Sequence, residues 1–204
     1  MTGHAARVVL VRHGQTEWSA TGRHTSFTDL DLTPEGEVQA RAIPYLLDGL
    51  GLSPAVVLCS PRTRSRRTAE LAGLTVDGVV DDLAEWSYGA YEGLTSAEIH
   101  VSAPGWSIFT SGAPGGETPD EVSQRADRAL TLARERLPEG DVVLIGHGHM
   151  SRVLSARWIG LPASHGGKLA MHPAAITVLG SYHDAPALEH VNVVPFALRD
   201  LGGV

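Results

Sequence analysis

Two histidines end apolar runs of the sequence in the same way. Residues 8–14 are VVLVRHG and residues 142–149 are VVLIGHGH, so that His13 and His147 each precede a glycine. In open α/β sheets, ligands bind beyond the carboxyl ends of the strands, and both side chains could therefore face one pocket. A histidine there can be a nucleophile or a proton carrier. A single histidine of this kind is more often structural than catalytic, but the repeated arrangement favours a catalytic role for both.

A third apolar run, residues 55–59, passes into an arginine-rich segment. Ser60 and Pro61 predict a helix start there, because a hydroxyl caps a helix and proline fits its first turn. The predicted helix carries Arg62, Arg64, Arg66 and Arg67. Free backbone N–H groups at its positive end, beside guanidinium groups, would suit a phosphate. Because a helix turns its side chains to several faces, only one or two of the arginines can reach the pocket.

The elements that would position these residues follow an α/β pattern. Strands are predicted at 7–11, 55–59, 142–146 and 176–179. The first three have no polar face, which is typical of strands buried in a parallel sheet. The predicted fold class is therefore α/β, a three-layer α/β/α sandwich with a mostly parallel central sheet.

Helix signals lie between the predicted strands. Thr33-Pro34 and Thr118-Pro119 each place a capping hydroxyl before a proline, and Glu121 completes a capping box with Thr118. Residues 118–137 carry one apolar face that would pack on the sheet. Pro44 is expected to kink the helix that begins near Thr33. Residues 103–116, rich in glycine and proline, form the longest predicted irregular segment and a candidate lid.

Composition limits the class of protein. A chain of 204 residues fits a single domain, 1–204. The net charge of −7, with no basic run, speaks against nucleic acid as a partner. No apolar stretch is long enough for a membrane span or a signal peptide, and the single cysteine, Cys59, cannot form an internal disulfide. We therefore expect a cytoplasmic protein without a membrane partner; its oligomeric state stays open, and a homodimer is compatible with the sequence.

The ordered set of motifs resembles the histidine phosphatase superfamily, also called the phosphoglycerate mutase-like family. The segment that begins at Arg12-His13-Gly14 is RHGQTEWSATGRHTSFTDLDLTPEG. It is followed, in the family's order, by SPRTRSRRTA (60–69), LAEWSYGAYEG (83–93), GGET (115–118) and VVLIGHGH (142–149). The resemblance covers nearly the whole chain and implies the phosphoglycerate mutase-like fold. It is strongest to the branch of acid phosphatases and sugar bisphosphatases.

The resemblance implies a role for each matching residue. His13 would be the nucleophile, Arg12, Arg64 and His147 the phosphate clamp, and Glu85 the proton donor. An imidazole nitrogen can form a phosphohistidine that water then hydrolyses. Arginines and a second histidine, preferably protonated, would stabilise the charge on the transferred phosphoryl group. Glu85 would protonate the leaving oxygen and then, as a carboxylate, accept a proton from water.

Further residues are expected to bind phosphate or substrate, namely Ser19, Arg23, His24, Thr25 and Gly148. The expected ligand is a small phosphorylated metabolite, with no cofactor and no metal. Two positions depart from the family. Ser19 stands where asparagine is frequent, which puts its phosphate contact in doubt, and Arg62 stands at a usually apolar place, where we expect it to face solvent.

Other catalytic motifs fail in detail. A cysteine phosphatase needs an arginine six positions after its cysteine, but Ser65 stands there after Cys59. The D-x-D-x-T pattern at 29–33 does not follow a buried strand, and His147-Gly148-His149 lacks further zinc ligands at ordinary spacing. Walker, dinucleotide-binding and serine hydrolase motifs do not occur.

The sequence therefore predicts a phosphatase that hydrolyses small phosphomonoesters, with sugar phosphates or bisphosphates among the candidates, through a phosphohistidine. One alternative is a phosphoglycerate mutase, although the chain looks too short for the segments that enclose a bisphosphorylated cofactor. The other is a non-catalytic protein of the same fold that binds a phosphorylated ligand. It is weakened because every expected catalytic residue type is present.

Overall fold

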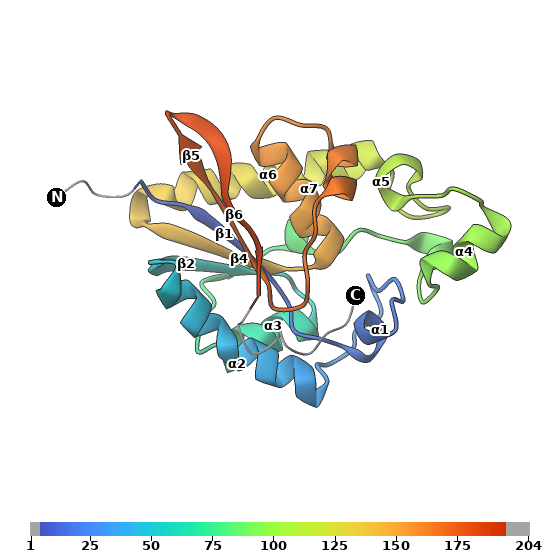
Figure 1. Ribbon diagram of the computed structural model, residues 1–204, viewed down its shortest axis with the longest axis horizontal. Coiled ribbons are helices and arrows are strands. Elements are labelled where there is room, and N and C mark those ends of the chain that lie inside the picture. Colours follow the sequence, from blue (N-terminus) through green and yellow to red (C-terminus); the bar gives the residue numbers. More distant parts are fainter. Residues whose placement is uncertain (1–4, 195–204) are drawn as a thin grey trace.

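A single mixed sheet organises the protein in the computed structural model, which describes residues 5–194 (Figure 1). The strand order is β3-β2-β4-β1-β5-β6. The strands are β1 Val8–Arg12, β2 Pro54–Cys59, β3 Gly78–Val79, β4 Asp141–Gly146, β5 Ile176–Tyr182 and β6 Ala185–Val193. Strands β1 to β4 pair in parallel, whereas β5 and β6 add antiparallel pairs at one edge. The prediction of a mostly parallel sheet is confirmed for this core.

The register brings three strand ends together. Arg12 at the end of β1 lies opposite Gly146 at the end of β4, and Cys59 of β2 lies opposite Ile145. The ladder continues one residue further, since the His13 N–H donates to the Gly146 carbonyl at 2.9 Å. Residues that follow β1, β2 and β4 must therefore meet at one edge of the sheet.

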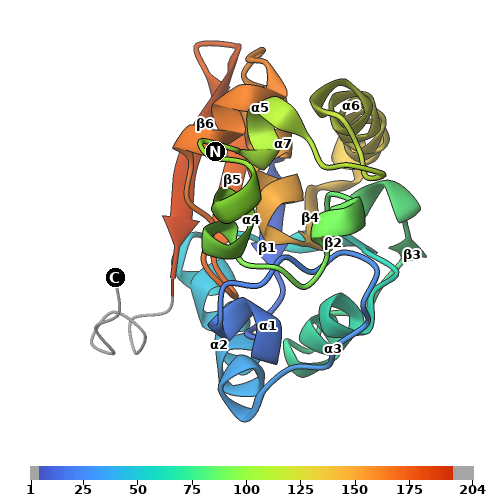
Figure 2. The ribbon, with the colours of Figure 1, turned by 90° about the vertical axis from the view of Figure 1, so that its right-hand side faces the viewer.

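Helices cover both faces of the sheet, as Figure 2 shows, with α2 and α3 on one side and α6 and α7 on the other. The helices are α1 Glu17–Ala20, α2 Pro34–Gly49, α3 Thr63–Leu71, α4 Ser96–Ser102, α5 Ile108–Ser111, α6 Pro119–Arg136 and α7 Gly148–Trp158. Successive residues of β1 enter different clusters: Val8 and Leu10 share one with α6 and α7, and Val9 and Val11 share the other with α2 and α3. This alternation produces the predicted three layers.

Two of the three predicted helix starts are confirmed. Thr33 caps α2 by accepting the Gly36 N–H, and Thr118 caps α6 in a capping box with Glu121. Helix α2 continues through Pro44 to Gly49.

The third predicted start, at Ser60, is wrong. Helix α3 begins at Thr63, and Arg62 occupies the capping position without a side-chain hydrogen bond. The Ser60 hydroxyl is instead 2.7 Å from Nε2 of His147. Asp29, from a distant loop, accepts hydrogen bonds from the Thr63 N–H at 2.9 Å and the Thr63 hydroxyl at 2.6 Å. A tertiary contact thus replaces the local cap.

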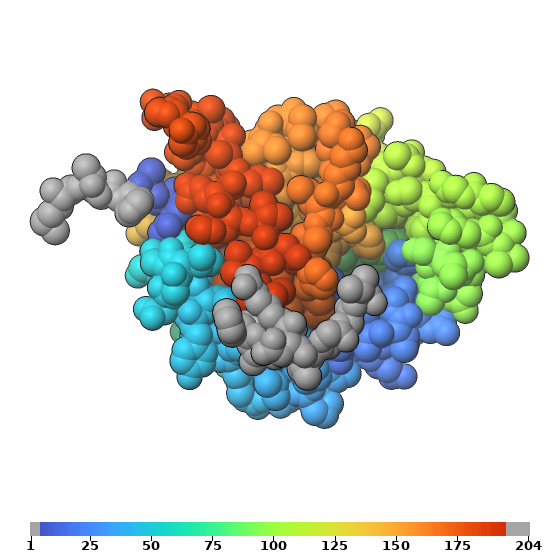
Figure 3. All heavy atoms as spheres, in the orientation of Figure 1, coloured from blue at the N-terminus to red at the C-terminus, as the bar shows by residue number. Residues whose placement is uncertain are grey.

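The segment 103–116 is less irregular than predicted, because it contains α5 and directly follows α4. Within this segment, the indole N–H of Trp106 donates to the Gly112 carbonyl at 2.7 Å and so links the residues on either side of α5. In the space-filling view of Figure 3 the part of the chain around α4 and α5 forms a lobe at the right-hand end. Within residues 5–194, no helix combines the length and apolar character needed to cross a membrane.

Candidate active site

His13 lies at the end of β1 in the state that a nucleophile needs. Its Nδ1 is 2.7 Å from the Gly14 carbonyl, and because a carbonyl only accepts, Nδ1 carries the proton and Nε2 keeps a free lone pair. Burial and the nearby Arg64 and Arg12 hold the His13 pKa well below its usual value. A β-carbon on Gly14 would lie 2.2 Å from the Gly36 carbonyl oxygen, so only glycine lets the chain pass here.

One nitrogen of the Arg12 guanidinium group is held by the protein backbone. Its Nη1 donates to the Met171 carbonyl at 2.6 Å. Its Nε is buried and has no hydrogen-bond partner among residues 5–194. The neighbouring α7 begins at Gly148, where an added β-carbon would lie 3.2 Å from Cζ of Arg12. A buried N–H without a partner is costly, and a phosphate oxygen would remove that cost.

Arg64 is fully buried and lies behind the wall of the cavity rather than on it. Its Nη1 donates to the Thr28 carbonyl at 3.0 Å, and its Nη2 donates to the carbonyls of Thr25 and Ser26, each at 3.2 Å. Its Nε donates to His147 Nδ1 at 3.3 Å. Arg64 therefore fastens the 25–28 loop to the sheet and places a buried positive charge behind His13.

His147, at the end of β4, is also fully buried. Its ring centroid lies 5.2 Å from that of His13. Because Arg64 donates to Nδ1, the proton of a neutral ring sits on Nε2, which donates to the Ser60 hydroxyl at 2.7 Å. Burial, followed by the charges of Arg64 and other basic neighbours, holds the His147 pKa well below its usual value. The protonated form expected from the sequence is therefore disfavoured.

The Glu85 carboxylate lies against the N-terminus of α7. Its Oε1 accepts the N–H groups of Trp86 at 2.9 Å and Met150 at 2.8 Å, and its Oε2 accepts that of His149 at 3.0 Å. Arg125 fixes the same backbone by donating to the Glu85 carbonyl at 3.2 Å. Glu85 borders the cavity. The hydrogen bonds to its carboxylate and to its backbone carbonyl hold it in that position.

A cavity of about 260 Å³ opens at this edge of the sheet. Most of the predicted residues line it: Arg12, His13, Ser19, Arg23, His24, Thr25, Glu85 and Gly148. The hydroxyl of Ser19 is occupied in the capping box of α1, donating to the Thr16 carbonyl at 3.0 Å. Arg23 donates to the Gly93 carbonyl at 2.7 Å and lies near Glu98. These side chains thus have partners before any ligand binds.

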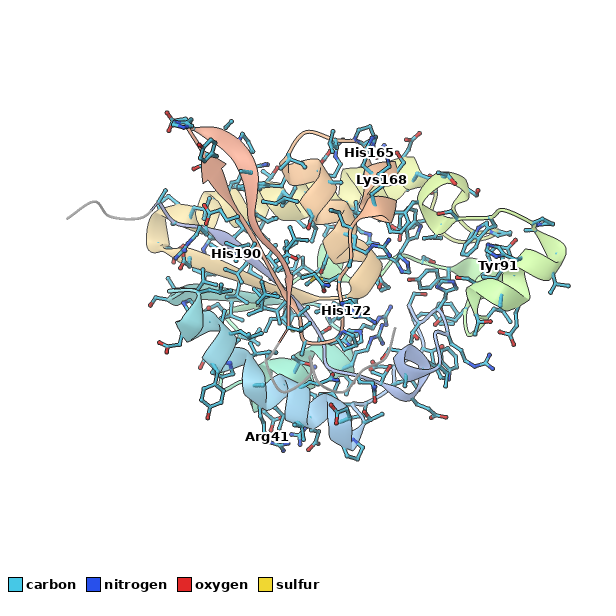
Figure 4. All side chains as sticks on the ribbon, viewed as in Figure 1. Arg41, Tyr91, His165, Lys168, His172 and His190 are labelled. Carbon is cyan, nitrogen blue, oxygen red and sulfur yellow. The ribbon has the colours of Figure 1, made fainter. Side chains whose placement is uncertain are left out.

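Sequence reasoning missed part of the wall, namely Thr16, Gly22, Tyr88, Ser96, His149, Arg152 and Met171. The Tyr88 hydroxyl forms a hydrogen bond with Nδ1 of His149 at 2.5 Å. Both lie inside motifs quoted for the resemblance, EWSYG and GHGH, so a signal existed for them. Met171 enters from the loop before β5, where Figure 4 marks the neighbouring His172. No local pattern marks Met171.

Arg62 differs from the expectation that it faces solvent. It is half-buried, and its Nε is enclosed without a partner in the described chain. Its charge also lowers the pKa of His147, although burial is the largest cause. Metal ligands were not expected, and residues 5–194 hold no group of three His, Cys, Asp or Glu side chains that could bind a metal ion.

Comparisons with known proteins identify the family of the chain. The model of the histidine phosphatase superfamily (branch 1) matches residues 8–194. An acid phosphatase of Mycobacterium tuberculosis is 47% identical over 87% of each chain. A sedoheptulose 1,7-bisphosphatase of Saccharomyces cerevisiae is 35% identical over 76% of this chain and 68% of its own. The solved structure of an open-reading-frame product of M. tuberculosis superposes with a TM-score of 0.90 and 44% identity, covering 93% of this chain and 98% of that one. The chain belongs to the histidine phosphatase superfamily.

Proposed function

We propose that this protein is a phosphoric monoester hydrolase of the histidine acid phosphatase type, which acts on small phosphorylated metabolites through a phosphohistidine at His13. The observation that carries the proposal is the state of His13. Burial and two nearby arginines lower its pKa, its Nδ1–H is held by the Gly14 carbonyl, and it borders a cavity beside the unpartnered Nε of Arg12. The names of the relatives support hydrolysis, since an acid phosphatase and a sugar bisphosphatase are among them.

The first half-reaction transfers the phosphoryl group. Nε2 of His13 attacks phosphorus, the P–N bond forms, and the P–O bond to the organic group breaks. Glu85 gives a proton to the departing oxygen, so that an alcohol rather than an alkoxide leaves. Arg12 binds the phosphoryl oxygens, while buried Arg64, held by its hydrogen bond to neutral His147, supplies the positive field that stabilises the charge shared by these oxygens.

The second half-reaction restores the enzyme. Water attacks the phosphohistidine, the P–N bond breaks, and inorganic phosphate leaves. The Glu85 carboxylate accepts the proton of the attacking water, so the residue ends in the state in which it started. No metal takes part, because Arg12 and the buried charge of Arg64 provide the positive charge.

The proposal is tested by following phosphate release and group transfer together. The purified protein, treated with EDTA, is assayed with p-nitrophenyl phosphate and with 3-phosphoglycerate. We expect inorganic phosphate from both, without exchange between 3- and 2-phosphoglycerate. Exchange without phosphate release would make the protein a mutase, and binding without either would make it a non-catalytic phospholigand protein. Activity lost in EDTA and restored by zinc or magnesium would contradict the metal-free mechanism.

A further inference from the structure

A second cavity of about 180 Å³ adjoins the catalytic one. His24, Ser96, His149 and Arg152 line both cavities, so these side chains form the boundary between the two. Beyond the boundary, the second cavity is lined by Trp106, Ser107, Ile108 and Phe109, together with His100 and Gly167. These residues belong to the lobe of α4 and α5 and to the segment after α7, and none of them has a role in the proposed phosphoryl transfer.

The two histidines of the boundary are neutral and packed, whereas Arg152 carries a positive charge. The rings of His24 and His149 have centroids 5.7 Å apart, and that of His24 lies 5.4 Å from Trp106. His24 Nε2 is 3.3 Å from the Ser96 hydroxyl. Burial lowers the His24 pKa to about 4 and places the pKa of His149 well below its usual value. At neutral pH both rings therefore offer one N–H donor and one nitrogen acceptor.

The far side of the second cavity combines aromatic faces with hydroxyl groups. The indole of Trp106 packs edge-on against Tyr91, with centroids 5.2 Å apart, and Figure 4 places Tyr91 within the lobe. Phe109 lies under the Arg152 guanidinium group, whose Cζ is 4.4 Å from the ring. Arg152 donates to the carbonyls of Gly166 at 2.9 Å and Gly167 at 3.1 Å, and these bonds fix the guanidinium group over Phe109.

The volume of the two cavities and the chemistry of their lining together indicate which class of ligand they bind. Pockets that hold a whole small-molecule ligand are commonly about 300–1,000 Å³. The catalytic cavity alone, at about 260 Å³, falls below that range, whereas the two cavities together lie within it. Hydroxyl and imidazole groups beside aromatic faces suit the hydroxyls and carbon–hydrogen faces of a sugar or sugar alcohol.

We propose that the organic group of the substrate extends past the boundary of His24, Ser96, His149 and Arg152 into this second cavity, and that the protein selects phosphomonoesters whose hydroxylated organic group has the length of a hexose. This inference rests on the proposed function and adds a substrate class to it. A three-carbon ester would fill the catalytic cavity and leave the second one empty. The second cavity should therefore separate long substrates from short ones.

The test fills the second cavity and compares two substrates. Ser107 lines it, and no hydrogen bond of its side chain helps to cap α5. Gly167 lines it from the other side, where an added β-carbon would lie 3.5 Å from the Phe109 ring, an ordinary contact. The variants are Ser107→Leu and Gly167→Leu, and the control is Thr110→Leu, at an exposed position on α5 that borders neither cavity. The substrates are glucose 6-phosphate and glycerol 3-phosphate.

We expect kcat/KM of the wild type to be higher for glucose 6-phosphate, and each filling variant to lower its ratio to that of glycerol 3-phosphate about tenfold. Thr110→Leu should leave the ratio as in the wild type. An unchanged ratio in both filling variants, with the proteins folded by circular dichroism, would overturn the inference while phosphatase activity persisted. A folded wild type that releases phosphate from neither sugar nor nitrophenyl esters would instead refute the proposed function, and this inference with it.

Discussion

The two ends of the catalytic cavity are built in different ways. At the phosphate end, His13 lines the cavity and His147 is buried beside it; they directly follow β1 and β4, and a parallel register fixes their separation. The opposite wall is assembled from loops. His24, for example, is held because its N–H donates to the Leu94 carbonyl at 2.9 Å and its carbonyl accepts the Gly93 N–H at 2.8 Å. These partners lie far apart in the sequence.

This difference separates the chemistry from the choice of substrate. Groups that follow the sheet and the helix ends are held by many backbone bonds and cannot shift without disturbing the core. Loop residues can change one at a time while the sheet stays intact. Variants at the phosphate end should therefore affect all substrates alike, whereas variants in the opposite wall should affect substrates differently.

The largest expected effect comes from His13→Ala. Removal of the nucleophile should lower phosphate release more than about 10³-fold for every substrate, because no neighbouring nitrogen can replace Nε2. The measurement is turnover of p-nitrophenyl phosphate, together with acid-quenched detection of labelled phosphoenzyme. Circular dichroism serves as the folding control. A folded variant that keeps more than a few per cent of the activity would exclude His13 as the nucleophile.

The second prediction compares two arginines of α3. Arg64→Ala should lower kcat about 100-fold or more for all substrates, since removal of one group that stabilises the transition-state charge costs a few kcal/mol. Arg67 is partly exposed and pairs with Glu37 and Glu70, so Arg67→Ala should change kcat by less than about twofold. Urea unfolding of both variants is needed as well, because Arg64 also holds the 25–28 loop. Equal losses of activity would mean that the wrong face of α3 was assigned.

The same contrast explains how much the sequence alone could predict. The strands before His13 and His147 were recognisable from their apolar runs, and the caps at Thr33 and Thr118 from local patterns. Strand β6 was missed because it is largely exposed, and its pairing with β5 shifts register. Without an apolar pattern, such an edge strand carries little signal.

Tertiary contacts account for the errors at the site. Ser60 looked like a helix cap, but Asp29 supplies hydrogen-bond acceptors at the start of α3, and Ser60 pairs with His147. The charge of His147 also depends on its surroundings, because burial beside Arg64 disfavours protonation. Neither fact is local to the sequence, so neither could be predicted from spacing.

Glu85→Gln connects the two ends of the cavity, because its effect should depend on the leaving group. Loss of the proton donor should slow phosphoenzyme formation from a sugar phosphate about 100-fold, and from p-nitrophenyl phosphate much less, since nitrophenolate leaves without a proton. Single-turnover measurements isolate this step from the later hydrolysis, in which Glu85 also takes part.

Equal slowing of phosphoenzyme formation with both leaving groups would show that Glu85 is not the acid. Glu92, the other carboxylate in the same motif, is not a suitable replacement. It accepts hydrogen bonds from the N–H groups of Ser26 at 2.9 Å and Thr28 at 3.0 Å, and it does not border the catalytic cavity. Such a result would therefore indicate that solvent supplies the proton.

The smallest effect concerns stability and tests whether the histidine-rich walls are neutral. Burial lowers the pKa values of His13, His24, His147 and His149, and that of His24 falls to about 4. In the unfolded chain these residues titrate near about 6.5. Below that pH the unfolded state binds more protons than the folded one, so stability must fall as the pH falls, by at most about 1.4 kcal/mol per pH unit for each histidine.

The free energy of unfolding in urea should therefore decrease between pH 7 and pH 5, and His24→Gln should make the decrease shallower because one of the neutral rings is gone. The range stays above the usual pKa of exposed carboxylates, whose titration would otherwise add to the slope. A wild-type stability that is flat or rises over this range would mean that these rings are protonated in the folded protein. In that case the boundary between the two cavities would carry positive charge on its histidines as well as on Arg152, and it would suit an anion rather than the neutral hydroxyls of a sugar.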